Sequence, residues 1–323
     1  MLKAHPHTDY MSHPREAFLL ASILAAFAVL LTSCATTSKM AKPLNQFSNA
    51  ATDATTITAS ALTVVQNADQ DEGVIKASKL TSLKEKDVPE FFRPEDLLQR
   101  QLVLQALGNY ATTLKTLSGV DRSADIQKSF DSLKTSIEST VTTINKLDTG
   151  STPIPSGVVS GLVSLGSNVV IAYSVGEREK AIRTALERSD STVKEICALL
   201  ASELRPGRPI YDQLQRAYRT QEEAISDNFE AISSPKPDKD GKTPPAAKPS
   251  DLAPYAKTFI GIRTKKENSM ALLSSLASAY RGIAEAHTAL KIESETGAKS
   301  EIQLRQLSAA IDRVKFFYAQ ATK

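Results

Sequence analysis

The feature that most constrains the fold is the spacing of apolar residues, which recur every three or four positions through most of the chain after residue 43. The spacing is clearest near the C-terminus, in two stripes: Leu273, Leu276, Tyr280, Ile283, His287 and Leu290, then Leu304, Leu307, Ile311, Val314 and Tyr318. This spacing places the side chains of each stripe on one face of an α-helix. Because only a short turn around Gly297 separates the stripes, the sequence predicts an antiparallel helical hairpin.

Five further segments carry the same spacing, over residues 44–68, 97–117, 126–144, 157–204 and 211–232. Glycine and aromatic residues are sparse and tryptophan is absent, which favours helices packed through small and aliphatic side chains. We therefore expect residues 44–323 to form an all-α domain, an elongated antiparallel bundle of about six or seven helices. Residues 233–254 contain six prolines and predict a flexible, solvated loop within it.

An apolar run near the N-terminus bears on where the chain is located. Arg15 and Glu16 precede residues 17–31, which are uncharged and mostly apolar, and small residues follow. A basic flank, a short apolar core and small residues at its end are typical of a secretory signal peptide. The run is shorter than the ~20 apolar residues that a transmembrane helix needs. Met11 is an alternative start that gives a leader of more ordinary length.

The end of this run reads Leu31-Thr32-Ser33-Cys34, and it resembles the lipobox of bacterial lipoproteins, in which an aliphatic residue and two small residues precede a cysteine. The resemblance covers only the leader. It implies that the lipoprotein signal peptidase recognises the three residues before Cys34 and cuts there. The Cys34 sulfur would carry diacylglycerol and its amino group an acyl chain such as palmitate, and several acyl chains anchor a protein stably. An ordinary signal peptide or signal anchor with a chance cysteine is the alternative.

This resemblance implies a signal peptide over residues 1–33, then lipidated Cys34 with a polar tether to residue 43, then the bundle. Ala35 follows the cysteine. In enterobacterial-type sorting an aspartate there retains a lipoprotein in the inner membrane, so alanine implies the periplasmic face of the outer membrane. The inner membrane and the cell surface are the alternatives.

The most unusual segment of the predicted bundle is residues 149–176, which contain no charged residue. Gly157 and Gly161 form a small-x-x-x-small pair and Gly166 follows, so helix backbones can approach closely here. The serines and glycines make a poor lipid-facing surface. We expect a buried central helix that continues to about residue 204. A membrane-inserting helix over residues 153–175 and an oligomer interface are the alternatives.

Two adjacent phenylalanines, Phe91 and Phe92, lie between Pro89 and Pro94. Both prolines interrupt helices, so the phenylalanines belong to a connection between helices. We expect them to fill the end of the bundle. The alternative is an exposed contact for a partner.

The residue types that carry most catalytic and metal chemistry are scarce. After the leader the chain has one histidine, His287, and one cysteine besides Cys34, namely Cys197. Both lie in apolar patterns, so we expect a hydrogen-bonded core histidine and a buried thiol without a disulfide partner. The sequence contains no phosphate-binding loop, dinucleotide fingerprint or nucleophile elbow. We therefore predict no metal, no cofactor and, with a net charge of +3, no nucleic-acid partner.

Together these observations favour a non-enzymatic, lipid-anchored envelope protein that binds a protein or an envelope component, or that acts as a structural spacer. Its expected contact surfaces are the ends of the bundle and the corner at Phe91 and Phe92. One alternative is a membrane-active, pore-forming helical protein that inserts residues 153–175. Another is a hydrolase of unknown type that uses His287.

Overall fold

The described part of the chain is helical, as the apolar spacing predicts. The computed structural model describes residues 38–78, 93–119, 123–146, 154, 156–173, 178–237, 239 and 241–323, and Ser38–Lys323 form one compact unit. These residues contain no strand, and the predicted all-α bundle is confirmed. The helices are α2 (Ala41–Ser78), α3 (Pro94–Ser118), α4 (Ser123–Lys146), α5 (Ser156–Tyr173), α6 (Arg178–Glu203), α7 (Pro209–Ser233), α8 (Pro249–Thr296) and α9 (Glu301–Ala321).

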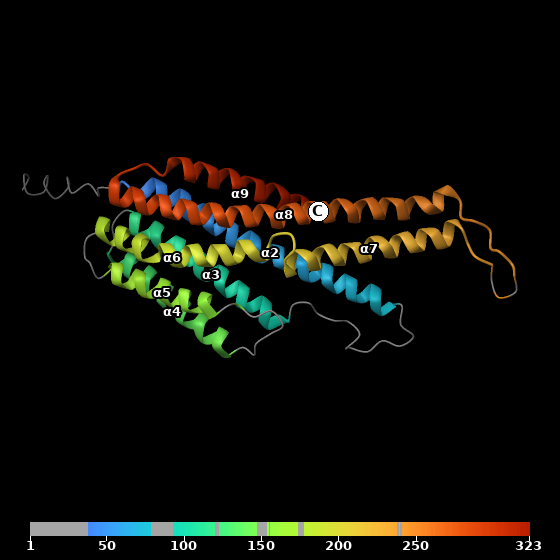
Figure 1. Cartoon of the computed structure of the whole chain (residues 1–323), viewed down its shortest axis with the longest axis horizontal. Helices are drawn as coiled ribbons and strands as arrows, with labels where there is room; N and C mark the ends of the chain where they lie inside the picture. Colours follow the sequence, from blue (N-terminus) through green and yellow to red (C-terminus); the bar gives the residue numbers. More distant parts are fainter. Residues whose placement is uncertain are drawn as a thin grey trace, which may run out of the picture. The chain divides into compact units, whose positions relative to one another are not determined.

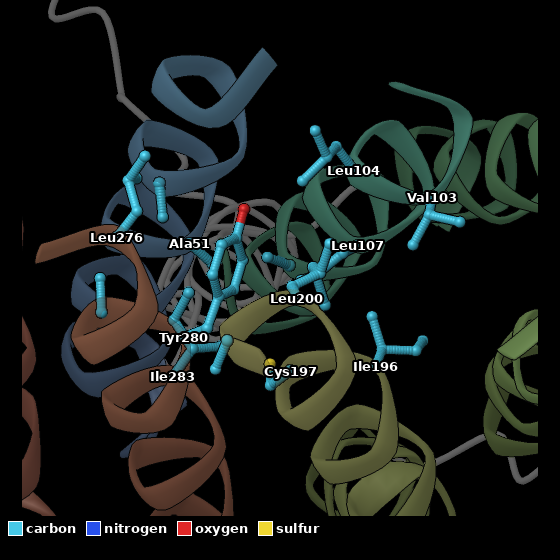
Figure 2. Packing of buried hydrophobic residues seen from close by; sticks show 14 of the residues in the cluster. Ala51, Val103, Leu104, Leu107, Ile196, Cys197, Leu200, Leu276, Tyr280 and Ile283 are labelled. Atoms are coloured by element: carbon cyan, nitrogen blue, oxygen red, sulfur yellow. The ribbon is translucent and has the colours of Figure 1, made fainter. Parts of the chain in front are cut away.

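The core lies where α2, α3, α6 and α8 meet. Helix α8 packs against α2, α6, α7 and α9, and α2 packs against α3 (Figure 1). Figure 2 shows side chains from these helices converging around Tyr280, which is fully buried. Alanines such as Ala51 and Ala279 are also fully buried, and their small size lets neighbouring helices approach closely. Cys197 is buried and free, as predicted.

The predicted C-terminal hairpin is confirmed. Helices α8 and α9 pack against each other, and Gly297 ends α8 in the left-handed conformation, with φ of 77°. Its amide donates to the Glu293 carbonyl at 2.8 Å, which is a common way to end a helix at glycine. The Ser300 amide, at the start of α9, donates to the Glu293 side chain at 3.1 Å. The turn is therefore held from both helices.

The expectation of one long helix through residues 157–204 is wrong. The chain forms two helices, α5 and α6, that pack against each other. The Asn168 amide donates to the Arg188 carbonyl at 2.9 Å, and a Cβ at Gly161 would lie 3.3 Å from the Thr192 methyl group. From the first contact to the second, the residue number falls along α5 and rises along α6, so the two helices are antiparallel. The apolar spacing continues across the break, so it could not reveal the reversal.

Helix α2 is longer than predicted, because the charged stretch that begins at Asp69 is helical as far as Ser78. Asp69 and Glu72 are buried there, at 6% and 3% exposure. The Gln213 amide of α7 donates to both carboxylates, at 3.1 Å from the Glu72 oxygen. Buried carboxylates are tolerated only with such partners. Glu72 also pairs with Lys76 one turn along α2, but the sequence of α2 does not show the partner on α7.

The proline-rich connection is shorter than the predicted 233–254, because α8 begins at Pro249. Proline is favoured in the first turn of a helix, where its missing amide would have no intrahelical partner. The Asp251 carboxylate accepts from the Lys248 amide at 3.3 Å and supports this start. Pro254 lies inside the helix. The described part of the connection is exposed for most of its length.

Candidate functional site

The one histidine of the bundle lies at the centre of a buried polar network. The imidazole of His287 on α8 is fully buried. Its Nδ1 lies 3.2 Å from Oδ1 of Asp190 on α6, and its Nε2 lies 2.7 Å from the hydroxyl of Tyr110 on α3. Thr288 donates to the same Asp190 oxygen at 2.8 Å, and Lys194 donates to the other at 2.7 Å. The network therefore joins three helices that are distant in sequence.

The burial and charges of this network determine which of its groups carry a proton. Burial lowers the pKa of His287, although the Asp190 carboxylate acts in the opposite direction. Burial alone would raise the pKa of Asp190, but hydrogen bonds from His287, Lys194 and Thr288 hold it well below its usual range. An ionised carboxylate can only accept, so Nδ1 of a neutral His287 donates to Asp190 and Nε2 accepts from Tyr110. Burial raises the pKa of the Tyr110 hydroxyl, which remains protonated.

A histidine oriented by an aspartate is also the arrangement of a general base, but the geometry here does not suit catalysis. A general base must reach the proton that it removes from a substrate. Nε2 of His287 already accepts from Tyr110 inside a fully buried ring. The expected hydrogen-bonded core histidine is therefore confirmed, and the hydrolase hypothesis loses the exposed histidine on which it depends.

The other predicted site residues fall into two groups. Leu31, Thr32, Ser33 and Cys34 lie outside the described residues, as do Phe91 and Phe92, so the predictions made for them stay predictions. The glycines of the uncharged segment lie on α5. Gly157 is exposed, and nothing lies within 4 Å of a Cβ built there.

The remaining two glycines lie at close helix contacts. A Cβ at Gly161 would lie 3.3 Å from Thr192 of α6, and a Cβ at Gly166 would lie 3.1 Å from Ile137 of α4. Both glycines are buried. Of the three residues, Gly161 and Gly166 therefore let α5 approach its two neighbours closely.

Helix α5 is not the buried central helix that we expected from its lack of charge. It packs on α4 and α6 with one face, which carries buried Leu162 and Leu165. Beside this face, Val163 and Ile171 are 47% and 41% exposed. Since α5 lies at the side of the bundle, it leaves apolar surface uncovered. Membrane insertion would require α5 to leave its contacts with α4 and α6.

An apolar groove of about 410 Å³ runs between α4 and α5. Its apolar lining comes from Ile137 and Val141 of α4 and from Val163, Gly166 and Ile171 of α5. Lys134 and Glu138 also line the groove, and their side chains are 57% and 65% exposed. The volume falls within the range of about 300–1,000 Å³ that ligand sites occupy. The lack of charge in residues 149–176 marked α5 as unusual, but the apolar spacing of α4 predicted only a buried helix face and gave no sign of a groove.

A second groove, about 710 Å³, lies between α2 and α3 and is polar. Asn49 of α2 accepts from the Lys115 ammonium of α3 at 3.2 Å beside it. Asn45, Thr52 and Thr116 supply further amide and hydroxyl groups. Water satisfies such groups as well as a ligand does, so this groove selects no ligand class.

Within the described ranges, no three histidine, cysteine, aspartate or glutamate side chains are grouped so that they could hold a metal ion. Among the same residues, no helix combines the length and the apolarity that crossing a membrane requires. Comparison of the chain with protein-family models, with curated proteins and with solved structures found no match.

Proposed function

We propose that this chain is a non-enzymatic docking protein of the bacterial envelope, held at the periplasmic face of the outer membrane by lipid on Cys34. Its helical body would bind a protein or an envelope component through the α4–α5 groove. The observation that carries this proposal is the groove itself, because most of its lining surface is apolar and Val163 and Ile171 remain almost half exposed in it. An apolar surface that the folded body leaves uncovered is typical of a binding site.

Two further features support binding rather than chemistry. The His287–Asp190 pair is enclosed in the core, with both ring nitrogens engaged by protein groups. Val163 and Ile171 instead project from α5 with almost half of their surface exposed. The surface that is available to a partner is therefore apolar and shaped by two packed helices, which suits a complementary apolar side chain, helix or acyl chain.

Site-specific photocrosslinking in the native envelope tests the docking surface. A photoreactive residue at position 163 would lie in the groove, and one at position 164 is the matched control, because Ser164 is exposed on the same helix but does not line the groove. We expect a discrete crosslinked species from position 163 and none from position 164. The same products from both positions, or none from either, would refute docking at this groove.

The anchor is tested separately by Cys34→Ala. We expect the variant to leave the outer-membrane fraction and to accumulate as soluble or uncleaved precursor, because the acceptor sulfur is missing. A Cys34→Ala protein that still fractionates fully with the outer membrane would exclude the lipid anchor. That result would leave the groove experiment unaffected.

A further inference from the structure

The far ends of α7 and α8 form a two-helix arm, defined here as residues 219–233 and 249–267. The two helices run side by side to a common tip (Figure 1). Tyr218 meets Ser269 at 3.3 Å, and Glu222 forms an ion pair with Lys266 at 2.7 Å. These pairs fix an antiparallel register. Along the arm no side chain is buried, although several large apolar residues lie at the seam, which is the line of contact between the two helices.

Apolar residues gather on one of the exposed sides of the arm. In an antiparallel helix pair, the residues that follow seam positions by one place lie on the same side of both helices. Arg219 and Glu223 of α7 and Arg263 and Glu267 of α8 occupy such positions, and they are 59% to 75% exposed. That side is therefore open to solvent on both helices.

Nearer the tip, the same side carries few charges and small side chains. Ile260 is 63% exposed there, the seam residue Phe229 is 37% exposed beside it, and their neighbours on this side are Ser226, Ala253 and Ala256. The register of the two seam pairs places Ile260 close to the level of Phe229. We call these five residues the arm patch. A large apolar side chain among small ones can insert between the helices of a facing pair.

The two helices of the arm carry opposite charge. Residues 219–233 of α7 contain four acidic residues and one basic residue, whereas residues 249–267 of α8 contain four basic and two acidic residues. Arg219 pairs with Glu223 and Arg263 with Glu267 within their own helices, so the net charges of the two helices remain opposite. Glu230 and Lys257 lie at the same level, beside the arm patch. The arm is thus complementary to a second arm, provided that the α7 of each copy lies over the α8 of the other.

We propose that the arm patch is a self-association surface, on which a second copy of this chain docks its own arm. Two-fold symmetry allows two face-to-face arrangements of helix pairs. Parallel arms place each α7 over the partner's α8, and antiparallel arms place α7 over α7. The second arrangement opposes acidic helices, so the charge pattern selects parallel arms. Ile260 of each copy then packs near Ser226 of the other, and Glu230 meets Lys257.

Disulfide trapping with the full chain tests this arrangement. Two differently tagged copies are produced together, one with Ser226→Cys and the other with Ile260→Cys, and the cells are oxidised. We expect a disulfide dimer that contains both tags. The matched control is Gly261→Cys in place of Ile260→Cys, because Gly261 is exposed on α8 with nothing within 4 Å of its Cβ position, but lies away from the patch. Parent chains with the two natural cysteines give the background.

Charge exchange gives a second, independent readout. Glu230→Lys or Lys257→Glu alone places like charges at both symmetric contacts, and we expect each to lower the yield of trapped dimer about tenfold. Mixing the two variants restores both opposite-charge contacts, so the yield of the mixed dimer should recover. Neither change alters a seam residue, so the arm itself is expected to remain folded.

The remaining outcomes overturn the proposal. Trapping only between two copies of Ile260→Cys would mean antiparallel arms, and the charge argument would be wrong. Crosslinking to other proteins, equal trapping from the Gly261→Cys control, or failure of the charge-exchanged pair to recover would each exclude a second copy as the occupant. These outcomes are separate from those for Cys34 and the α4–α5 groove, on which this inference does not depend.

Discussion

The sharpest test of the core is the substitution Asp190→Asn, which keeps the shape of the side chain and removes its charge. The Asp190 carboxylate accepts from Thr288 at 2.8 Å and from His287 at 3.2 Å through one oxygen, and from Lys194 at 2.7 Å through the other. Asparagine retains the first oxygen as a neutral amide acceptor. Its amide group would face the Lys194 ammonium, so two donors would meet where a hydrogen bond exists now.

The size of the effect follows from the burial of each partner. A hydrogen bond to a charged group contributes ~1.5–3 kcal/mol and a neutral one ~0.5–1.5 kcal/mol, so each retained bond loses about 1 kcal/mol. Lys194 is 49% exposed, and an ion pair of that exposure contributes less than about 1 kcal/mol. We therefore expect Asp190→Asn to lower the free energy of unfolding by about 2–3 kcal/mol at neutral pH.

The chain offers a matched control in Asp53→Asn. Asp53 also forms an aspartate–lysine pair of 2.7 Å, with Lys315, but its side chain is 41% exposed and that of Lys315 is 52% exposed. Urea unfolding followed by far-ultraviolet circular dichroism should show a loss of at most about 1 kcal/mol for this variant. If the two variants lost the same free energy with unchanged m-values, the His287–Asp190 network would contribute no more than a surface ion pair.

Three further predictions concern single residues. The urea midpoint should fall as the pH decreases below about 6.5, because burial lowers the pKa of His287 and the unfolded chain then binds a proton that the folded chain does not; a midpoint that stays constant down to pH ~5 would contradict this. Gly157→Ala should raise the free energy of unfolding by at most about 0.5 kcal/mol, because nothing lies near the new Cβ but Gly157 is only the second residue of α5, whereas Gly166→Ala should give no net gain because its Cβ lies 3.1 Å from a neighbouring side chain; equal gains would refute the close contact. Cys197 should not react with a thiol reagent until urea unfolds the chain, because it is fully buried and burial raises its pKa; fast reaction of the native thiol would show that the core opens.

The sequence predicts which segments of this chain are helical better than it predicts where each helix ends or which helices pack against each other. The three-and-four spacing is a local property, so it identified the hairpin of α8 and α9 and the burial of His287. It failed at Asp69 and Glu72, because the Gln213 side chain that satisfies them lies on α7, far away in sequence. It failed again between α5 and α6, because apolar spacing can continue through a reversal of the chain.

The α4–α5 groove was only half predictable for a related reason. The lack of charge in residues 149–176 marked α5 as unusual, and we interpreted this as complete burial. The groove exists because α5 has a single covered face, and which face is covered depends on α6 and α4 together. Ile137 and Val141 belong to the seam of an ordinary amphipathic helix in the sequence. Ile137 is indeed buried, at 3% exposure, so the apolar surface left open beside Gly166 is mainly that of Val163 and Ile171 on α5.

The buried polar side chains explain how such similar helices find the correct neighbours. Apolar stripes of alanine and leucine fit several partners about equally well, so they specify helix packing poorly. Hydrogen bonds between distant helices are more selective, because a wrong pairing leaves a buried polar group without a partner, at a cost of ~1–3 kcal/mol. Tyr280 donates to Thr58 at 2.7 Å and joins α8 to α2, while Tyr110 and His287 join α3 to α8. Changing these pairs to apolar residues of equal size should therefore lower the free energy of unfolding only slightly, but it should allow several alternative helix packings. We expect the variant to keep its helicity and to lose its near-ultraviolet circular dichroism signal.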